Sequence, residues 1–314
     1  MNALQSELKP YLASVAGELN TIQTGEDIPY FYQPIRYVLT LPAKRIRPLL
    51  LQLVAHTLGV APEQSRYAAA AVELLHNFTL VHDDVMDQDD LRRGAPTVHK
   101  KWDVATAILA GDGLMGMAFQ KLLASPRGDL VEMARRFAAT MVVVCEGQGK
   151  DKMFEELDRV SEQEYLDMIG RKTAALLRLS CELGALLAEA DQTAVKKAGD
   201  LGYALGMGFQ IQDDLLDILA DQRELGKDIG SDLERHKQTI LAIKLAERMP
   251  EENVFALSLD DFRARLQETG VLQEVRAMSE RYFETAFDNL SRLPQGQPRV
   301  ILEHLAGYIR KRRW

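Results

Sequence analysis

Apolar residues recur at helical spacing along almost the whole chain. Between residues 176 and 187, for example, leucine occupies positions 176, 177, 179, 183, 186 and 187. This spacing places the side chains on one face of a helix, whereas the strict alternation typical of a strand is scarce. Clusters of glycine and proline divide the pattern into roughly ten helices of ordinary length. The predicted fold class is therefore all-α.

The helices are expected to form one domain that spans residues 1–314. No long linker rich in Ser, Gly or Pro interrupts the chain, and no period of about 20 to 50 residues indicates a repeat array. The alanine-rich segment from Ala68 to Val72 is compatible with close approach between helices. We therefore expect a single-domain helical bundle with its site in the core.

Composition narrows the classes of function. The chain has 38 basic and 46 acidic residues and a formal charge of -8, which argues against a nucleic-acid partner. Cys145 and Cys181 lie in apolar stretches, as buried thiols of a reducing compartment do. The first ten residues lack the apolar core of a signal peptide, and charges interrupt every candidate membrane span. We expect a cytoplasmic protein without a transmembrane segment.

An acidic cluster ends the apolar helical stretch that begins near Leu74. Asp83 and Asp87 lie one helical turn apart, and Asp84 stands between them. Carboxylates on one helix face repel each other unless a cation bridges them, and oxygen-only ligands suit Mg²⁺ better than Zn²⁺. Taken alone, the cluster is better explained as a solvated helix end.

A second copy of the same spacing makes a metal site the better explanation than a solvated helix end. Asp213, Asp214 and Asp217 lie in the segment GFQIQDDLLDI (208–218), and Gln210 precedes them by one turn. The segment around them is apolar, so these carboxylates would be costly to bury without a cation. Two identical DDxxD spacings on separate apolar helices therefore favour a paired Mg²⁺ site.

Positive charge accompanies the first acidic cluster. Arg92 and Arg93 precede the helix-stopping Gly94, so we expect them on a loop close to the aspartates. A second basic cluster occupies residues 44–47, just before Pro48. Arginine side chains match the oxygens of phosphate groups, so both clusters are candidate anion sites.

Eight motifs follow one another in a highly specific order. They are KRIRP (44–48), HNFTLVHDDVMD (76–87), LRRGAPTVH (91–99), AGDGL (110–114), EGQ (146–148), KT (172–173), GFQIQDDLLD (208–217) and GKD (226–228). With these motifs, most of the chain resembles the trans-isoprenyl diphosphate synthases, the family of farnesyl and geranylgeranyl diphosphate synthases. One departure is His236, which precedes Lys237 where the family usually has glycine.

The resemblance implies a helical bundle of the isoprenoid synthase type with a central apolar cavity and two diphosphate pockets. In the family, the two aspartate motifs face each other and hold three Mg²⁺ ions on the allylic diphosphate. This assigns six ligands here, namely Asp83, Asp84, Asp87, Asp213, Asp214 and Asp217. Four basic residues would contact the same diphosphate, namely Arg92, Lys172, Lys227 and Lys237.

A second set of residues is implied for isopentenyl diphosphate, namely Lys44, Arg47, His76 and Arg93. Thr173 and Gln210 would lie near the reacting carbons. The implied reaction ionises the allylic diphosphate, joins its cation to the isopentenyl double bond and then eliminates a proton. The family also implies a homodimer.

Three alternatives remain open at this point. A class I terpene cyclase or head-to-head synthase also ionises allylic diphosphates, but it needs no isopentenyl diphosphate pocket. A non-catalytic partner subunit could lose motif carboxylates, whereas both motifs are complete here. Product length is also open, since Phe78 before the first motif resembles geranylgeranyl formers, and farnesyl formers have a second aromatic residue where this chain has Thr79.

Overall fold

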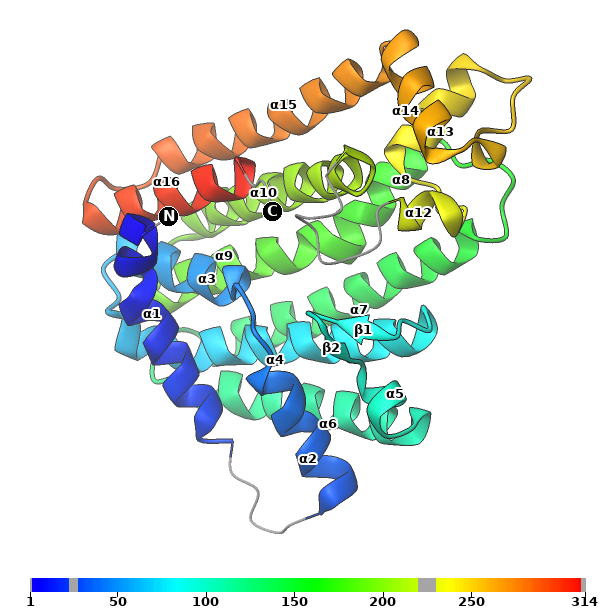
Figure 1. Cartoon of the computed structure of the whole chain (residues 1–314). Helices are drawn as coiled ribbons and strands as arrows, with labels where there is room; N and C mark the ends of the chain where they lie inside the picture. The colour runs from blue at the N-terminus through cyan, green and yellow to red at the C-terminus, as the bar shows by residue number, and fades with distance from the viewer. Residues whose placement is uncertain (1, 23–27, 220–229, 312–314) are drawn as a thin grey trace. The chain divides into compact units, whose positions relative to one another are not determined.

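The structure is a computed structural model that describes residues 2–22, 28–219 and 230–311. These residues are mostly helical, which confirms the predicted all-α class (Figure 1). Their β-structure is one antiparallel hairpin, formed by β1 (Leu91–Arg92) and β2 (Ala95–Pro96). None of the described helices combines the length and the apolar composition needed to cross a membrane.

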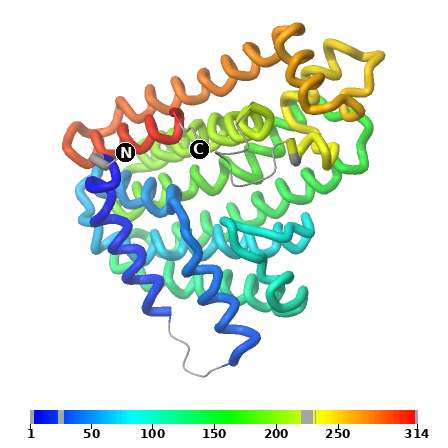
Figure 2. Tube along the Cα trace, in the orientation of Figure 1, coloured from blue at the N-terminus to red at the C-terminus, as the bar shows by residue number. Residues whose placement is uncertain are grey.

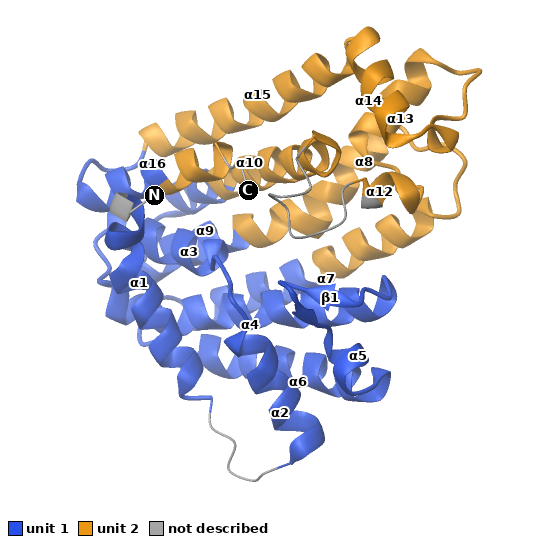
Figure 3. Ribbon diagram, in the orientation of Figure 1, with its two compact units in different colours: residues 1–141, 179–199, 293–304 blue, residues 142–178, 200–292, 305–314 orange. Residues whose placement is uncertain are grey.

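The chain divides into two compact units (Figure 3). Unit 1 comprises residues 1–141, 179–199 and 293–304, and unit 2 comprises residues 142–178, 200–292 and 305–314. Residues of both units occur in α7 (Leu130–Phe154), α9 (Ala175–Leu187), α10 (Gln192–Leu219) and α16 (Gln297–Arg310). The single domain expected for residues 1–314 stays a prediction.

Helix α4 is the central helix of unit 1. The helices that lie wholly in this unit are α1 (Asn2–Asn20), α2 (Pro29–Thr40), α3 (Ile46–Thr57), α4 (Pro62–Met86), α5 (Val98–Lys101) and α6 (Val104–Leu123). Helix α4 packs against α1, α3 and α6, and it runs beside α6 in the Cα trace (Figure 2). Residues 68–71 of α4 are fully buried alanines, whose small side chains allow the neighbouring helices to approach closely.

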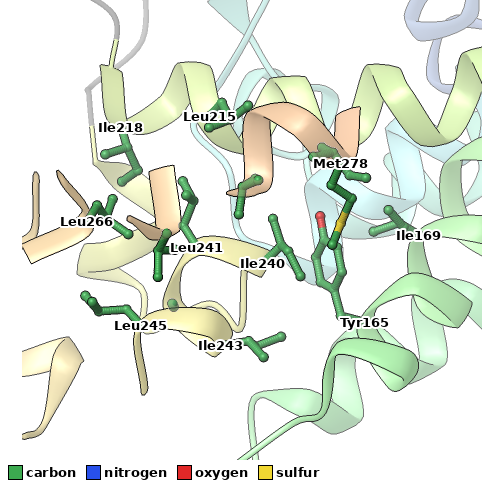
Figure 4. Close-up of a cluster of buried hydrophobic side chains, with 14 of the residues drawn as sticks. Tyr165, Ile169, Leu215, Ile218, Ile240, Leu241, Ile243, Leu245, Leu266 and Met278 are labelled. Carbon is green, nitrogen blue, oxygen red and sulfur yellow. The ribbon is translucent and has the colours of Figure 1, made fainter. Parts of the chain in front are cut away.

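Unit 2 is built around a different apolar cluster. The elements that lie wholly in this unit are α8 (Glu162–Ile169), the π-helix η1 (Gly170–Ala174), α12 (Ser231–Glu234), α13 (Ile240–Arg248), the 3₁₀-helix η2 (Val254–Ala256), α14 (Leu259–Glu268) and α15 (Val271–Ser291). Ile240 and Leu241 on α13 meet Leu215 of α10, Leu266 of α14 and Met278 of α15 (Figure 4). This cluster supports the helix segment that carries the second aspartate motif.

Polar side chains define where several of these helices begin. Asp103 accepts a hydrogen bond from the backbone N–H of Thr106 at 2.7 Å and caps α6. Ser161 and Glu164 form a reciprocal capping box at the start of α8. Because these side chains satisfy N–H groups that have no partner within the helix, they end the preceding loops at defined residues.

The burial of Phe262 in the core of unit 2 leads to a prediction about stability. Phe262 on α14 is 1% exposed, so Phe262→Ala should lower the free energy of unfolding by about 3–5 kcal/mol through lost burial and a cavity. Val300→Ala on α16 is the control, because Val300 is 38% exposed and its change should stay within about 0.5 kcal/mol. Urea unfolding followed by circular dichroism measures both, and equal midpoints would contradict the assignment of this core.

Candidate functional site

The first aspartate motif forms the C-terminal end of α4. Asp83 and Asp84 lie in its last turn, and Asp87 ends the helix by donating its N–H to the Asp83 carbonyl at 2.8 Å. Asp83 and Asp87 are partly exposed, whereas Asp84 is buried. The three carboxylates therefore occupy two environments that their spacing alone does not reveal.

Arg92 fixes the buried carboxylate of Asp84. Its Nε donates to Asp84 Oδ1 at 2.8 Å, and its Nη2 bonds to the same oxygen and lies 3.4 Å from Asp89. Burial raises the pKa of Asp84, and the adjacent guanidinium of Arg92 opposes that rise. The basic residue predicted to lie near the first motif is thus in direct contact with it.

A tight hairpin turn presents Arg93. Arg92 pairs with Ala95, so Arg93 and Gly94 form a two-residue turn, and both have positive φ, at 55° and 75°. Such turns favour residues that tolerate the left-handed region, which explains the glycine. The sequence predicted a loop here, and the structure shows a hairpin.

The second basic cluster meets α4 at His76, about two helical turns before Asp83. Arg47, near the start of α3, lies 3.0 Å from His76, measured from Nη1 to Nε2. Burial lowers the pKa of His76 well below its usual value, and Arg47, Arg93 and Arg92 lower it further. His76 is therefore neutral, and its Nε2 accepts a hydrogen bond from Arg47. Lys44, the first residue of this cluster, is exposed.

Phe78 packs inside unit 1. It is 7% exposed, and its ring meets the ring of His82 edge to face, with centroids 4.8 Å apart. His82 Nε2 lies 3.3 Å from the carbonyl oxygen of Ile108 on α6. A Cβ on Gly111 would lie 2.1 Å from His82, so the first glycine of the AGDGL motif makes room for this ring.

The second aspartate motif lies near the C-terminal end of α10 and repeats the pattern of the first. Asp213 and Asp217 are partly exposed, and Asp214 is buried. Asp214 accepts hydrogen bonds from Tyr165 Oη at 2.6 Å and Gln210 Nε2 at 3.2 Å. Burial raises the pKa of Asp214 to about 7, and these hydrogen bonds oppose the rise.

Five predicted residues line one pocket of about 90 Å³ in unit 2, namely Lys172, Thr173, Gln210, Asp214 and Lys237. Thr173 donates from Oγ1 to Gln210 Oε1 at 2.8 Å, and Gln210 in turn holds Asp214. The structure therefore brings together side chains that are up to 65 positions apart, since 237 − 172 = 65. Lys227 and the GKD motif lie outside the described residues.

Lys172 and Thr173 are presented by the π-helix η1, a rare form that often occurs at functional sites. Two glycines allow neighbouring helices to approach it. A Cβ on Gly147 of α7 would lie 2.3 Å from the backbone nitrogen of Lys172, and a Cβ on Gly206 of α10 would lie 2.5 Å from Ala174 Cα. Close backbone packing thus explains the glycine of the EGQ motif.

Three acidic or phenolic residues of this pocket were not predicted. Asp151 pairs with Lys172 at 2.5 Å, Asp232 lies 3.7 Å from the Lys237 ammonium, and Tyr165 holds Asp214. Asp151 follows the EGQ motif by one turn, which is a signal that could have revealed it. Tyr165 and Asp232 stand in no motif, so nothing in the sequence singled them out.

His236, which stands where the family usually has glycine, adopts a backbone conformation typical of glycine. His236 has φ of 53°, the left-handed region that glycine adopts most easily, and its ring packs on Phe255 with centroids 5.4 Å apart. Lys237 then donates its N–H to the Asp232 carbonyl at 2.8 Å. A non-glycine residue in this region stores strain, which the surrounding contacts must offset.

The donor chemistry of both motifs fits Mg²⁺, because each partly exposed pair offers carboxylate oxygens one turn apart. In residues 2–22, 28–219 and 230–311, no three acidic, His or Cys side chains form a group that could hold an ion. The three ions and their six ligands therefore stay predictions.

The fold is that of the isoprenoid synthases. It matches the crystal structure of a geranylgeranyl pyrophosphate synthase with a TM-score of 0.90 and 33% identity over 100% of both chains. The chain is 39% identical to the geranylgeranyl diphosphate synthase of Sulfolobus acidocaldarius, covering 96% of this chain and 98% of that protein. It is also 39% identical to the geranylgeranyl pyrophosphate synthase of Geoglobus acetivorans over 90% of each.

Residues 28–275 match the polyprenyl synthetase family. The chain belongs to this family and is a prenyltransferase.

The close contact between α7 and η1 leads to a prediction about turnover, and α7 also offers a matched control. Gly147→Ala should displace Lys172 and Thr173, lowering prenyltransferase turnover on the order of 10²-fold, as expected for a shift near 1 Å at a reacting site. A Cβ on Gly149 would meet no described heavy atom within 4 Å, so Gly149→Ala should keep full turnover. Initial-rate assays compare them, and equal rates would contradict the role of this contact.

Proposed function

We propose that this prenyltransferase joins isopentenyl diphosphate head to tail to an allylic diphosphate and forms geranylgeranyl diphosphate. The observation that carries the proposal is the cluster of Arg47, His76 and Arg93, in which Arg47 lies 3.0 Å from His76 and both arginines lower the pKa of His76. A terpene cyclase would have no use for a second anion pocket. The cluster therefore favours chain elongation over that alternative.

We propose Mg²⁺ as the cofactor, three ions in all, with Asp83, Asp87, Asp213 and Asp217 as the ligands most accessible to an ion. When bound, Mg²⁺ stabilises the negative charge that develops on the leaving diphosphate. Asp84 and Asp214, which the resemblance also assigns as ligands, already accept hydrogen bonds from protein donors. In our proposal these two carboxylates complete the six ligands and also hold Arg92 and Gln210 in position.

The chain's own residues would bind and orient the two substrates. Arg92, Lys172 and Lys237, together with Lys227, would contact the allylic diphosphate and stabilise charge as its carbon–oxygen bond breaks. Thr173 and Gln210, already joined by a hydrogen bond, would lie near the reacting carbons.

Lys44, Arg47, His76 and Arg93 would hold isopentenyl diphosphate. A neutral His76 keeps Arg47 directed by the hydrogen bond between them. The released diphosphate would accept the proton lost in the last step.

Two side chains on α4 are the basis for the proposed length of the product. Phe78 is buried five residues before Asp83, and the smaller Thr79 is partly buried. We propose that Phe78 limits the growing tail. The two relatives reported above are both named as synthases of the geranylgeranyl product, which supports this length over farnesyl diphosphate.

We further propose a cytoplasmic homodimer. One face of α6 exposes Val104, Ile108, Leu109 and Leu123, each with 45–53% of its surface accessible. Exposed apolar surfaces of this kind commonly mark protein interfaces. Sedimentation velocity would detect the dimer, and a monomer at micromolar concentration would contradict it.

The function is tested by product analysis. Purified protein is incubated with Mg²⁺, isopentenyl diphosphate and each short allylic diphosphate, and the dephosphorylated prenols are identified by chromatography. We expect geranylgeraniol as the main product and no product in the presence of EDTA. A cyclised terpene, or turnover without isopentenyl diphosphate, would contradict the proposal.

Removing a proposed metal ligand should abolish turnover without unfolding the protein. Asp83→Ala and Asp213→Ala each delete a partly exposed carboxylate that has no part in the apolar core. Loss of charge stabilisation at the leaving group should lower kcat by at least about 10²-fold. Circular dichroism serves as the fold control, and near-wild-type condensation by either variant would rule out the paired-motif mechanism.

Changing the bulk of side chains on α4 should change the product. Phe78→Ala should open space below the tail and allow longer prenols, whereas Thr79→Phe should shorten the product by filling space one turn below Asp83. Chromatography of the dephosphorylated products measures both. If chain length is unchanged in both variants, another helix limits the tail.

A further inference from the structure

A buried carboxylate on α4 has no role in the function proposed above. Glu73 is 2% exposed and lies one turn before His76 and Asn77 on the same helix. It precedes Asp83 by ten residues and belongs to neither aspartate motif. A charged side chain in such a place requires compensation from its surroundings.

Three guanidinium groups interact electrostatically with Glu73. Burial raises the pKa of Glu73, and Arg93, Arg45 and Arg47 oppose that rise in this order of strength. The interaction is mutual for Arg93, since burial lowers the pKa of this arginine and Glu73 opposes the change. The arginines come from the start of α3 and from the hairpin turn, so Glu73 lies where two separate segments meet α4.

Hydrogen bonds hold only one side of the Glu73 carboxylate. Asn77 Nδ2 donates to the Glu73 carbonyl at 2.7 Å and to Glu73 Oε1 at 3.4 Å. Glu73 Oε2 and Asn77 Oδ1 are both buried and have no hydrogen-bond partner among the described residues. Asn77 also lines a small cavity together with Arg92 and Arg93. The region around Glu73 thus contains two such acceptors, and Arg47, which interacts with Glu73, has a buried Nε donor.

Stability alone explains this arrangement poorly, because apolar residues of similar volume usually stabilise a fold at least as well as buried charges. The structure assigns Glu73 as a positioning residue, whose carboxylate holds Arg45, Arg47 and Arg93 ready for isopentenyl diphosphate. This assignment rests on the proposed function, in which Arg47 and Arg93 bind that substrate. Three guanidinium groups repel one another, so a buried counter-charge keeps them assembled before the diphosphate arrives.

Positioning and simple charge have opposite consequences for substrate affinity. If Glu73 acted only as a negative charge near an anion pocket, its removal would strengthen the binding of isopentenyl diphosphate and lower its KM. If Glu73 positions the arginines, its removal disperses them and raises that KM. The direction of the change therefore separates the two roles.

Glu73→Gln is the decisive variant, because it removes the charge and keeps both the size and the hydrogen bond from Asn77. We expect KM for isopentenyl diphosphate to rise by about tenfold or more, because the counter-charge that keeps the arginines together is lost. The KM of the allylic substrate and kcat should stay near wild type. Glu63→Gln is the matched control, since Glu63 is exposed in the first turn of the same helix.

Glu73→Asp provides a second measurement if Glu73→Gln does not fold. It keeps the charge but withdraws it by one methylene, so it should raise KM for isopentenyl diphosphate by a smaller factor and leave the allylic KM unchanged. An unchanged or lower KM for isopentenyl diphosphate, or an equal rise for both substrates, would overturn the role of Glu73. A wild-type protein that condenses no substrates would instead contradict the proposed function.

Discussion

A carboxylate buried among apolar helices must be compensated by donors, and three acidic residues of this chain meet that requirement in different ways. Asp84 is held by Arg92 of the hairpin, and Asp214 by Tyr165 and the neighbouring Gln210. Glu73 lies within the field of three arginines. Apart from Gln210, these partners come from other segments of the chain, so each interaction also fixes the position of a second element. Asp84 fixes the hairpin, Glu73 the start of α3 and the hairpin turn, and Asp214 the neighbouring helix α8.

The same segments contain unusual backbone conformations. Arg45, Arg93 and His236 all have positive φ, between 50° and 55°, and each lies within or beside a predicted basic group. Lys172 lies on the π-helix η1. Such conformations cost free energy and persist only where surrounding contacts determine them, so their concentration at the predicted site is consistent with a functional origin.

Much of this site could be predicted from short-range sequence patterns. The helical spacing predicted the all-α class, and the repeated DDxxD spacing predicted aspartates one turn apart, as Asp83 and Asp87 are. The π-helix at residues 170–174 could not be predicted, because it depends on close packing against Gly147 and Gly206 rather than on local preference. The role of Tyr165 could not be predicted for a similar reason, since its hydrogen bond to Asp214 spans 49 positions.

The sequence by itself determined the fold class, the family and the residue types of the candidate site, because periodicity and ordered motifs are local properties of the chain. Only the tertiary structure decided which carboxylates are buried. Asp83 and Asp84 are adjacent in sequence, yet the second is buried against Arg92 and the first is partly exposed. Successive side chains of a helix point about 100° apart, so the packing of neighbouring segments, and not the residue type, sets the environment of each.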